Sequence, residues 1–406
     1  MNLKHIRKIL RDTDYVHTGG SAEELKAAEY LKAEAEAMGA SAWLETFPVQ
    51  MADIRSASLT ADGTAIPCEG YRNCGSGELE APFLYLPSQD PISLKAVKGK
   101  IVLIDGGLRH FAYHDLLDAG ALGFITYSGN VDFPDRDIDQ KELRGFVAEG
   151  RKALAVNINA KDAQKLVKDR PRTVKIAVDE TEYEGESRNV VAELPGKTDE
   201  WIVLSAHYDT VPLSHGAYDN MSGCIGLLEV MDRLRASAPH RYGLRFVFCG
   251  SEERGLLGSK AYTAAHEEDL KKVVLNINLD MIGTIMGRFI ACVSAEETLV
   301  HFIRYFAGAR GWGIDSHSGV YSSDSTPFAD HGVPSLSFAR ATPSGQSNIH
   351  CRYDTMSLLS DEQLRTDGDF VADFTAFMAD AVVCPVSRTI PDKIKEDLDK
   401  YLNRKR

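Results

Sequence analysis

The distribution of apolar positions divides the chain into two stretches of different character. From about residue 188 onward, near-continuous apolar runs alternate with helical segments, and the clearest runs are WIVLSA, LRFVFCG, VVLNINL and PSLSFA. Runs of this kind are typical of strands that are buried on both faces of a mostly parallel sheet. Helices are expected between them, for example over 222–236 and 298–309. The pattern predicts an α/β fold with a mostly parallel mixed sheet flanked by helices.

Between about residues 50 and 180 the apolar runs are shorter and separated by turns. They are PFLYL, KIVLID, FITYS, LAVNI and TVKIAV, with two helical pieces around HDLLDAG and AKDAQKLV. This spacing predicts a small β-rich domain with its own core.

A further helix is expected near the N-terminus, over residues 21–38. Ser21 and Glu24 have the spacing of a capping box, and Gly39 would stop the helix. Its apolar face would consist of Leu25, Ala28, Leu31, Ala35 and Met38. Ser360 and Gln363 would cap another helix that continues to about residue 380.

The simplest organisation is one domain interrupted by another. Residues 1–50 and 185–385 would form the α/β domain, residues 51–184 the insertion, and residues 386–406 a C-terminal helical tail. Two domains in series remain the alternative. The length of 406 residues supports two domains, because single cores stop growing at ~250–300 residues.

The net charge limits which partners the protein can bind, and the cysteine content indicates its cellular compartment. The formal net charge of -13 argues against a nucleic-acid or anionic-membrane partner, and it suits a cationic substrate such as a peptide with a free α-amino group. Seven scattered cysteines without a CxxC pair favour reduced thiols. There is no apolar stretch typical of a secretory signal and no run of 18 apolar residues. We therefore expect a cytoplasmic protein; its oligomeric state stays open.

Polar side chains follow the apolar runs of the second stretch. His207, Glu252–Glu253 and Asp280 come directly after three of the predicted strands, and a loop after the fourth leads to His350. Asp219 lies in GAYDNMSG, before the helix at 222–236. Open α/β sheets place ligand sites at this edge, and imidazole and carboxylate groups are zinc ligands. Each residue alone fits a cap or a rim position, but together the five predict a metal centre.

The same residues suit a pair of metal ions. Two zinc ions ~3.5–4 Å apart need a bridging ligand, and a carboxylate such as Asp219 has two oxygens for that role. Glu252 and Glu253 are adjacent and point different ways, so one can bind metal while the other reaches the reacting water. Asp209 can accept the second N–H of His207, and Asp354 can do the same for His350. Cobalt or manganese would fit the same ligands.

Six motifs carry a resemblance to a known family over residues 188–360: HYD, GAYDNMSG, SEERGLLGS, NLDMIG, SDSTPF and HCRYDT. They resemble the co-catalytic zinc exopeptidases, which include aminopeptidase Y, bacterial leucyl aminopeptidases, glutamate carboxypeptidase and the non-enzymatic transferrin receptor. The resemblance implies a phosphorylase/hydrolase-like α/β fold. It implies one zinc on His207 and Asp280, another on Glu253 and His350, and a bridge at Asp219. It also implies Glu252 as general base, with Asp209 behind His207.

The insertion resembles a protease-associated domain through VKGKIVLIDGG and HDLLDAGALGFITYSG. This resemblance supports the interrupted organisation. Tyr321 lies near the place where relatives have a tyrosine that stabilises the transition state, and Ser325 stands where many relatives have histidine. In relatives the stretch before His350, ARATPSGQSNIH, lines the substrate pocket.

The predicted function is removal of N-terminal amino acids from peptides by a water that two zinc ions activate. A carboxypeptidase or dipeptidase on the same site is the alternative, and a carboxypeptidase would need a cation such as Arg340 or Arg352 for the substrate carboxylate. A glutaminyl cyclase works with one zinc, and a non-catalytic receptor-like homologue would have lost ligands. No GxSxG or HExxH motif is present. His110, His114 and His317 are expected in loops, and His215 at the rim of the site or on a solvated turn.

Overall fold

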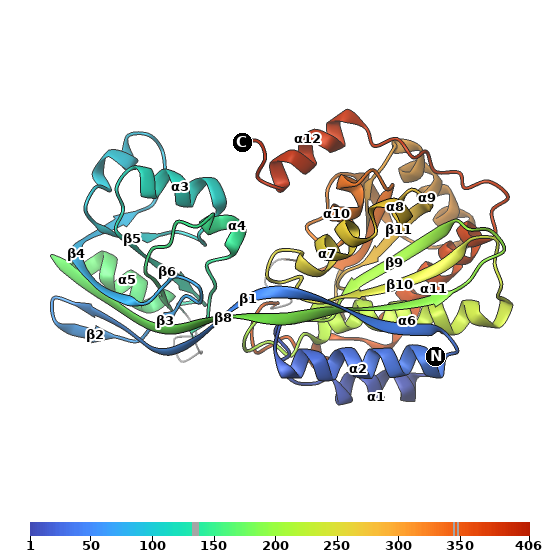
Figure 1. The fold of residues 1–406 in the computed structure, drawn as a ribbon, viewed down its shortest axis with the longest axis horizontal. Helices are drawn as coiled ribbons and strands as arrows, with labels where there is room; N and C mark the ends of the chain where they lie inside the picture. The colour runs from blue at the N-terminus through green and yellow to red at the C-terminus, as the bar shows by residue number, and fades with distance from the viewer. Residues whose placement is uncertain (132–137, 344–345, 347–348) are drawn as a thin grey trace. The chain divides into compact units, whose positions relative to one another are not determined.

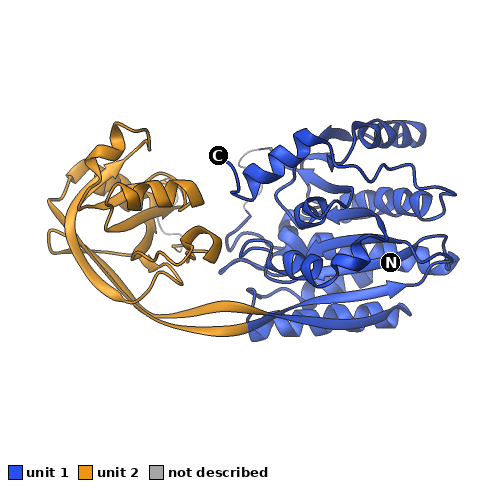
Figure 2. Cartoon of the chain, turned by 45° about the horizontal axis from the view of Figure 1, so that its top comes forward, with its two compact units in different colours: residues 1–47, 186–405 blue, residues 48–185, 406 orange. Residues whose placement is uncertain are grey.

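A computed structural model of the chain describes residues 1–131, 138–343, 346 and 349–406. Part of the stretch expected to line the substrate pocket, residues 344–345 and 347–348, therefore lies outside the described residues. The chain forms two compact units, one of residues 1–47 with 186–405 and one of residues 48–185 (Figure 2). Among the described residues, no helix combines the length and the apolar character that crossing a membrane requires.

A mixed sheet forms the centre of the larger unit (Figure 1). β14, β11, β9 and β10 are consecutive neighbours and run parallel to one another, while β12 and β8 pair antiparallel at the two sides of this group. The predicted fold class is confirmed. The strands are β8 (Thr173–Leu194), β9 (Trp201–His207), β10 (Gly243–Cys249), β11 (Val273–Leu279), β12 (Arg288–Ser294), β13 (Asp315–Ser318) and β14 (Ser335–Ala341).

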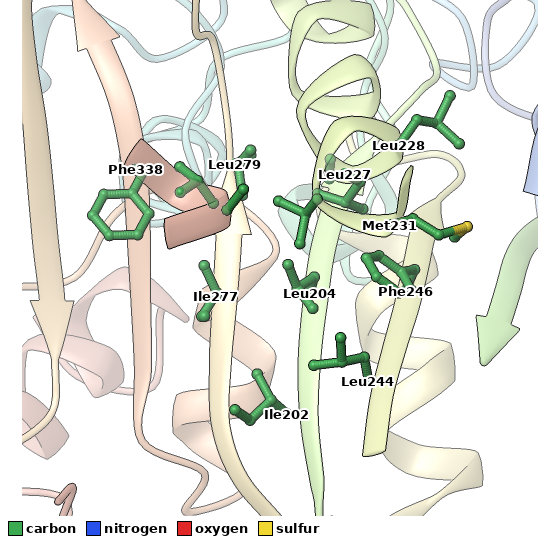
Figure 3. Close-up of a cluster of buried hydrophobic side chains, with 14 of the residues drawn as sticks. Ile202, Leu204, Leu227, Leu228, Met231, Leu244, Phe246, Ile277, Leu279 and Phe338 are labelled. Atoms are coloured by element: carbon green, nitrogen blue, oxygen red, sulfur yellow. The ribbon is translucent and has the colours of Figure 1, made fainter. Parts of the chain in front are cut away.

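Both faces of this sheet are covered, which explains why its central strands are apolar throughout. On one face, Leu227 and Met231 of α6 pack with Leu204 and Phe246 of the strands (Figure 3). On the other face, Val203 and Val247 share a core with Tyr262 and Phe328. Full burial of one such side chain contributes roughly 1.5–3 kcal/mol. The helices are α1 (Leu3–Asp12), α2 (Ala22–Ala37), α6 (Ser222–Leu234), α7 (Leu257–Ala265), α8 (Glu267–Leu270), α9 (Glu297–Arg310), α10 (Ser325–Asp330), α11 (Asp361–Ala379) and α12 (Asp392–Tyr401).

The N-terminus of α2 differs from the expected capping box. The Ser21 side chain accepts the N–H of Glu24, as predicted. The reciprocal bond is absent, because the carboxylate of Glu24 is fully buried and accepts from the N–H of Gly20 and from Ser187. The apolar face is also rotated: Leu25 is exposed, and Ala27 is buried with Ala28, Leu31 and Ala35.

The smaller unit is also built on parallel strands. β4 (Gly77–Leu86), β5 (Ile101–Ile104), β6 (Gly123–Ser128) and β7 (Ala155–Asn159) follow one another in the sheet, and β3 (Glu69–Gly70) pairs antiparallel with β7. Their core includes Val102, Leu103, Phe124 and Ile125. The helices are α3 (His110–Asp118), α4 (Gly145–Ala148) and α5 (Ala160–Asp169).

The longest strand that the pattern did not indicate is β1 (Ser41–Ala61), which pairs with β8 and with β2 (Thr64–Ile66). The histidines expected in loops also differ. His110 and His114 lie in α3, and His317 lies in β13. His215 is partly exposed and lies 2.7 Å from the carboxylate of Asp14.

Candidate metal centre

The carboxyl ends of the parallel strands bring the predicted ligands together. His207 is the last residue of β9, Asp280 follows β11, and Glu253 follows β10. Asp219 lies in the turn at Ala217–Met221 that leads into α6. Two groups of side chains have ligand-type atoms within 4.8 Å of one another. They are His207, Asp219 and Asp280, and Asp219, Glu253 and His350.

Asp219 belongs to both groups and presents a different oxygen to each. Its Oδ1 lies 3.1 Å from Nε2 of His207, and its Oδ2 lies 3.0 Å from Nε2 of His350. Nε2 of His207 is 3.6 Å from Oδ1 of Asp280, and Nε2 of His350 is 3.3 Å from Oε1 of Glu253. Tetrahedral zinc with bonds of ~2.0–2.1 Å places its ligand atoms about 3.3 Å apart. The spacings in both groups fit such an ion.

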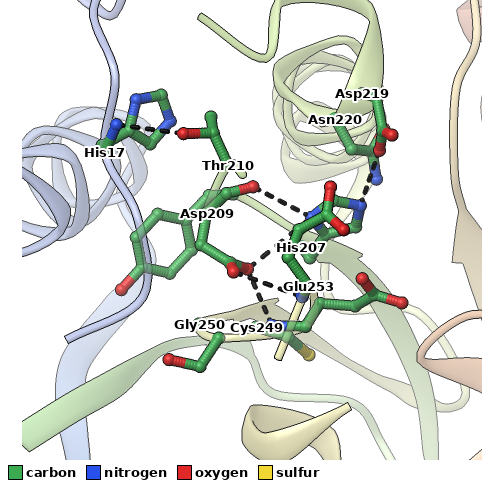
Figure 4. A network of polar contacts seen from close by, with 12 residues as sticks. His17, His207, Asp209, Thr210, Asp219, Asn220, Cys249, Gly250 and Glu253 are labelled. Carbon is green, nitrogen blue, oxygen red and sulfur yellow. Dashed lines mark hydrogen bonds and ion pairs between the residues drawn. The ribbon is translucent and has the colours of Figure 1, made fainter. Parts of the chain in front are cut away.

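The turn after β9 fixes the His207 ring. Nδ1 of His207 donates to the main-chain carbonyl of Asp209 at 3.2 Å, which leaves the lone pair on Nε2, facing the carboxylates. We expected the Asp209 carboxylate to accept this proton, but its Oδ1 lies 3.7 Å from Nδ1. The carboxylate instead accepts the main-chain N–H group of Glu252 at 2.8 Å. It also accepts the N–H group of Glu253 at 3.3 Å (Figure 4). Asp209 therefore ties the ends of β9 and β10 together.

Asp354 has a different partner from the one expected. Its carboxylate accepts the N–H groups of Tyr218 and Asp219, at 2.8 and 3.0 Å. Burial raises the pKa of Asp354 to about 7, and these two hydrogen bonds oppose that rise. The hydrogen bonds of Asp354 thus support the backbone that presents Asp219, and its expected role in orienting His350 stays a prediction.

Asn220 is a site residue that the sequence interpretation missed. Its Nδ2 donates to the carbonyl of Leu279, and its Oδ1 accepts the N–H of Met281, both at 2.9 Å. The same Oδ1 accepts the N–H of Gly223 in the first turn of α6. One side chain thus bonds to the residues on both sides of Asp280. The motif GAYDNMSG contained this residue, but nothing in it indicates which strand the amide would meet.

Several carboxyl groups are buried around these ligands. Burial raises the pKa of Glu252 well above its ordinary value, and burial also raises the pKa of Glu253. Asp324, fully buried at the start of α10, has a pKa raised to about 6 by burial. Burial opposes the charged form of Asp219, but hydrogen bonds from His207 and His350 hold its pKa below the ordinary value. A buried, acid-rich cluster of this kind is stabilised by bound cations.

A further observation on Asp280 also supports a metal ion at this site. Oδ1 of Asp280 is buried and has no hydrogen-bond partner among the described residues. A buried carboxylate oxygen without a partner is costly, and a metal ion would satisfy it.

Tyr321 is also near these acids: burial raises the pKa of its hydroxyl well above 10, and the negative charges of Asp280 and Asp219 add to that rise.

A third group of ligand-type side chains lies in the smaller unit and consists of His110, His114 and Glu149. Nη1 of Arg151 lies 3.3 Å from Nδ1 of His114. A guanidinium can only donate, so the imidazole accepts at Nδ1 and keeps its proton on Nε2. His114 therefore offers no lone pair to a cation in this arrangement, and we assign no metal here.

Comparisons with known proteins agree with this geometry. Residues 189–375 match peptidase family M28. Aminopeptidase YwaD of Bacillus subtilis (strain 168) is 32% identical over 302 residues, which cover 70% of this chain and 63% of YwaD. Leucine aminopeptidase 2 of Arthroderma otae is 32% identical over 209 residues, covering 47% of this chain and 38% of that protein. The structure of BSAP, a zinc aminopeptidase from Bacillus subtilis, superposes with a TM-score of 0.78 and 24% identity, over 96% of this chain and 98% of BSAP.

The fold is that of the BSAP structure, and in this chain histidines and carboxylates gather at the carboxyl edge of a mixed sheet. This chain is thus similar to peptidase family M28 over residues 189–375 and to aminopeptidase YwaD over a longer stretch. The matches span less than two thirds of the length of these two curated relatives.

Proposed function

We propose that this chain is an aminopeptidase that works with two zinc ions, in place of which cobalt or manganese would fit the same ligands. His207, Asp219 and Asp280 would hold one ion, and Asp219, Glu253 and His350 the other. The observation that carries the proposal is Asp219, whose two oxygens face two separate histidines at 3.1 and 3.0 Å. A carboxylate in this position is the bridge that a two-metal site requires.

The bound ions would polarise the carbonyl of the scissile bond and lower the pKa of water. Glu252 then acts as the general base: it takes a proton from the attacking water and passes it to the leaving amine. Burial raises the pKa of Glu252 well above its ordinary value. A raised pKa suits this role, because the carboxylate must take a proton from water and hold it until the amine leaves. Asp209 holds the main-chain N–H of Glu252 and so fixes the base beside the ligands. The Tyr321 hydroxyl, whose pKa is raised by burial and by the charges of Asp280 and Asp219, would donate to the carbonyl oxygen of the substrate.

The proposed substrate is a peptide with a free N-terminus. Its α-ammonium group would bind among the site carboxylates. A C-terminal specificity would need a free cation, and Arg340 does not supply it. Nε and Nη2 of Arg340 donate to the buried carboxylate of Asp367, and Nη1 donates to the carbonyl of Gly287.

A pair of isosteric variants tests the proposal. Glu252→Gln keeps the size of the side chain but cannot take a proton, so kcat should fall by ~10²–10⁴ while zinc content stays at two per chain. Glu253→Gln should weaken one metal site, and added zinc should partly restore activity. The measurements are metal analysis and kinetics on an aminoacyl substrate.

The matched control is the N-acetylated form of the same substrate, which lacks the ammonium group. Turnover of both forms at similar rates would contradict an aminopeptidase. Loss of zinc from Glu252→Gln but not from Glu253→Gln would reverse the two roles.

A further inference from the structure

We infer that a buried chain of hydrogen bonds from Glu24 through Ser187 to Ser251 positions the turn that carries Glu252 and Glu253. This inference rests on the proposed function, which gives those two glutamates their roles. Glu24 and Ser187 lie outside residues 189–375, the region that matches the family. The N-terminal segment would thus be part of the catalytic machinery through its contact with this turn.

The chain of bonds is continuous and shielded from water. Oγ of Ser251 lies 2.8 Å from Oγ of Ser187, and Oγ of Ser187 donates to Oε1 of Glu24 at 2.5 Å. Oε2 of Glu24 accepts the N–H of Gly20 at 2.9 Å, and Nη1 of Arg188 lies 3.4 Å from it. Glu24, Ser187 and Ser251 are all 0% exposed. Buried polar networks of this kind are costly to break, because each broken bond leaves an unsatisfied group.

The turn needs such support because its backbone is unfavourable. Ser251 has φ of 53°, and Leu256, at the other end of the turn, has φ of 60°. Residues other than glycine rarely adopt this left-handed conformation, and it persists where surrounding contacts over-determine it. Glu252 follows Ser251 directly, so a change of the Ser251 conformation would redirect the proposed base.

Close packing leaves the turn little freedom to move toward Glu24. A Cβ atom on Gly250 would lie 2.6 Å from Oε1 of Glu24 and 2.8 Å from Oγ of Ser187. A Cβ on Gly19 would lie 2.8 Å from Cα of Ser251. Only glycine permits these approaches, so the N-terminal segment contacts the turn backbone directly.

The turn is therefore held from two directions. Asp209 accepts the N–H groups of Glu252 and Glu253 from the side of the metal ligands. The bonds from Glu24 hold Ser251 from the opposite end of the same short segment. We assign Glu24, Ser187 and Ser251 as positioning residues, which act on the substrate only through Glu252 and Glu253.

The first test combines single and double variants of the full-length, zinc-loaded chain. Ser187→Ala and Glu24→Gln should each lower kcat about tenfold, with KM within about twofold and unchanged zinc content. The double variant should also lie about tenfold below wild type, because Ser187→Ala removes the middle of the chain of bonds and Glu24→Gln replaces one of the two acceptor oxygens at its end. Glu229→Gln is the matched control, since Glu229 is a buried glutamate on α6 with 8% exposure, and its kcat should stay within about twofold.

The second test separates the hydroxyl from the conformation at Ser251. Ser251→Ala removes the hydrogen bond but keeps the penalty against positive φ, so kcat should fall about tenfold. Ser251→Gly also removes the bond, but glycine adopts this conformation freely, so kcat should recover at least threefold over the alanine variant. This pair also serves if Glu24→Gln fails to fold. Equal activity in the two Ser251 variants would overturn the inference.

The third test does not depend on catalysis. Amide hydrogen exchange of the segment around Glu252 and Glu253, measured without substrate, should become at least tenfold faster in Glu24→Gln but not in Glu229→Gln. If the wild-type chain showed no peptidase activity, the proposed function would fail while this measurement still tested the positioning role. Unchanged hydrogen exchange in Glu24→Gln would overturn the inference. A double variant whose loss of kcat equals the product of the two single losses would also overturn it.

Discussion

The two groups of metal-ligand side chains share Asp219 but differ in how the fold supports them. The His207 side chain is 1% exposed and Asp280 6%, and both lie at the ends of adjacent strands. The His350 side chain is 49% exposed and lies in the loop between β14 and the short helix at Met356–Leu358. Its backbone has φ of 58°, which is unusual for a residue other than glycine.

In the proposed two-metal site, one group of ligands would thus be held by strand ends before metal binds, and the other would depend on a loop. Ligands on strand ends are held by the hydrogen bonds of the sheet before any ion binds, so little order is lost on binding. A ligand on an exposed loop gains part of its order from the metal itself. We therefore expect the ion bound to His207 to bind more tightly and exchange more slowly than the ion bound to His350.

The largest effect should come from removing the residue that the two groups share. Asp219→Ala deletes one proposed ligand from each group and the one carboxylate that the two groups share among the described residues, so both proposed ions should be lost. Peptidase activity should then fall by about 10⁴-fold or more. Metal analysis after dialysis measures the outcome. Two tightly retained ions would show that Asp219 is not the bridge.

The second largest effect should be a difference in how tightly the two proposed zinc ions are held. His350→Ala should leave one zinc bound, whereas His207→Ala should disrupt the group held by strand ends and weaken both ions. In the wild type, a chelator should remove zinc in two phases, and only the slow phase should remain in His350→Ala. A single phase with equal rates in both proteins would remove the distinction between the two groups.

A smaller loss should follow from the support behind Asp219. Asp354→Asn keeps one acceptor oxygen for the N–H groups of Tyr218 and Asp219 but replaces the other with a donor. We expect zinc affinity to fall by about 10–100-fold while the fold stays intact. Zinc titration with a competing indicator measures this loss. A change confined to the His350 ion would instead support the original expectation that Asp354 orients that ring.

The smallest effect concerns pH. Partial burial opposes protonation of His350 in the metal-free protein, but hydrogen bonds with Asp219 and Glu253 raise its pKa to about 11. Between pH 6.5 and 11 the folded protein therefore keeps a proton that the unfolded chain has lost. The contribution of His350 to metal-free stability is fully present below pH 6.5 and is lost as pH rises toward 11.

Zinc binding must displace that proton, so affinity for the second ion should rise up to about tenfold per pH unit in this window. Titrations at three pH values check the slope, and in His350→Ala this pH-dependent second binding step should disappear while the first step keeps its wild-type slope. Zinc affinity that does not change with pH would contradict the expectation that His350 is protonated in the metal-free protein.

Much of the central sheet could be predicted from the sequence because its strands are buried on both faces. WIVLSA became β9 and VVLNINL became β11, since covered strands need apolar residues at every position. β1 was missed because it carries Pro48 and many polar residues, and its exposed positions do not alternate regularly. α1 was missed although its buried side chains Ile6, Ile9 and Leu10 have the i, i+3, i+4 spacing of a helix.

The ligand types were predictable for a chemical reason, while their supports were not. Histidines and carboxylates that follow several predicted strands indicate a metal site, and a single sequence is enough to recognise that pattern. Which N–H group a buried carboxylate accepts depends on backbone direction in three dimensions. Asp209, Asp354 and Glu24 were each given a plausible local partner, and each makes its main contacts with a different segment of the chain.

The position of Asn220 has a consequence for the evolutionary history of such chains. Its amide bonds to Leu279 and Met281 and so determines where the intervening Asp280 stands relative to α6. If Asp280 binds metal as proposed, loss of this amide would displace a ligand, so selection for the metal would also act on Asn220. A lineage that abandons the metal would be released from this constraint. An asparagine directly after the aspartate at the position of Asp219 would then indicate a metal centre, in addition to the histidines and carboxylates themselves.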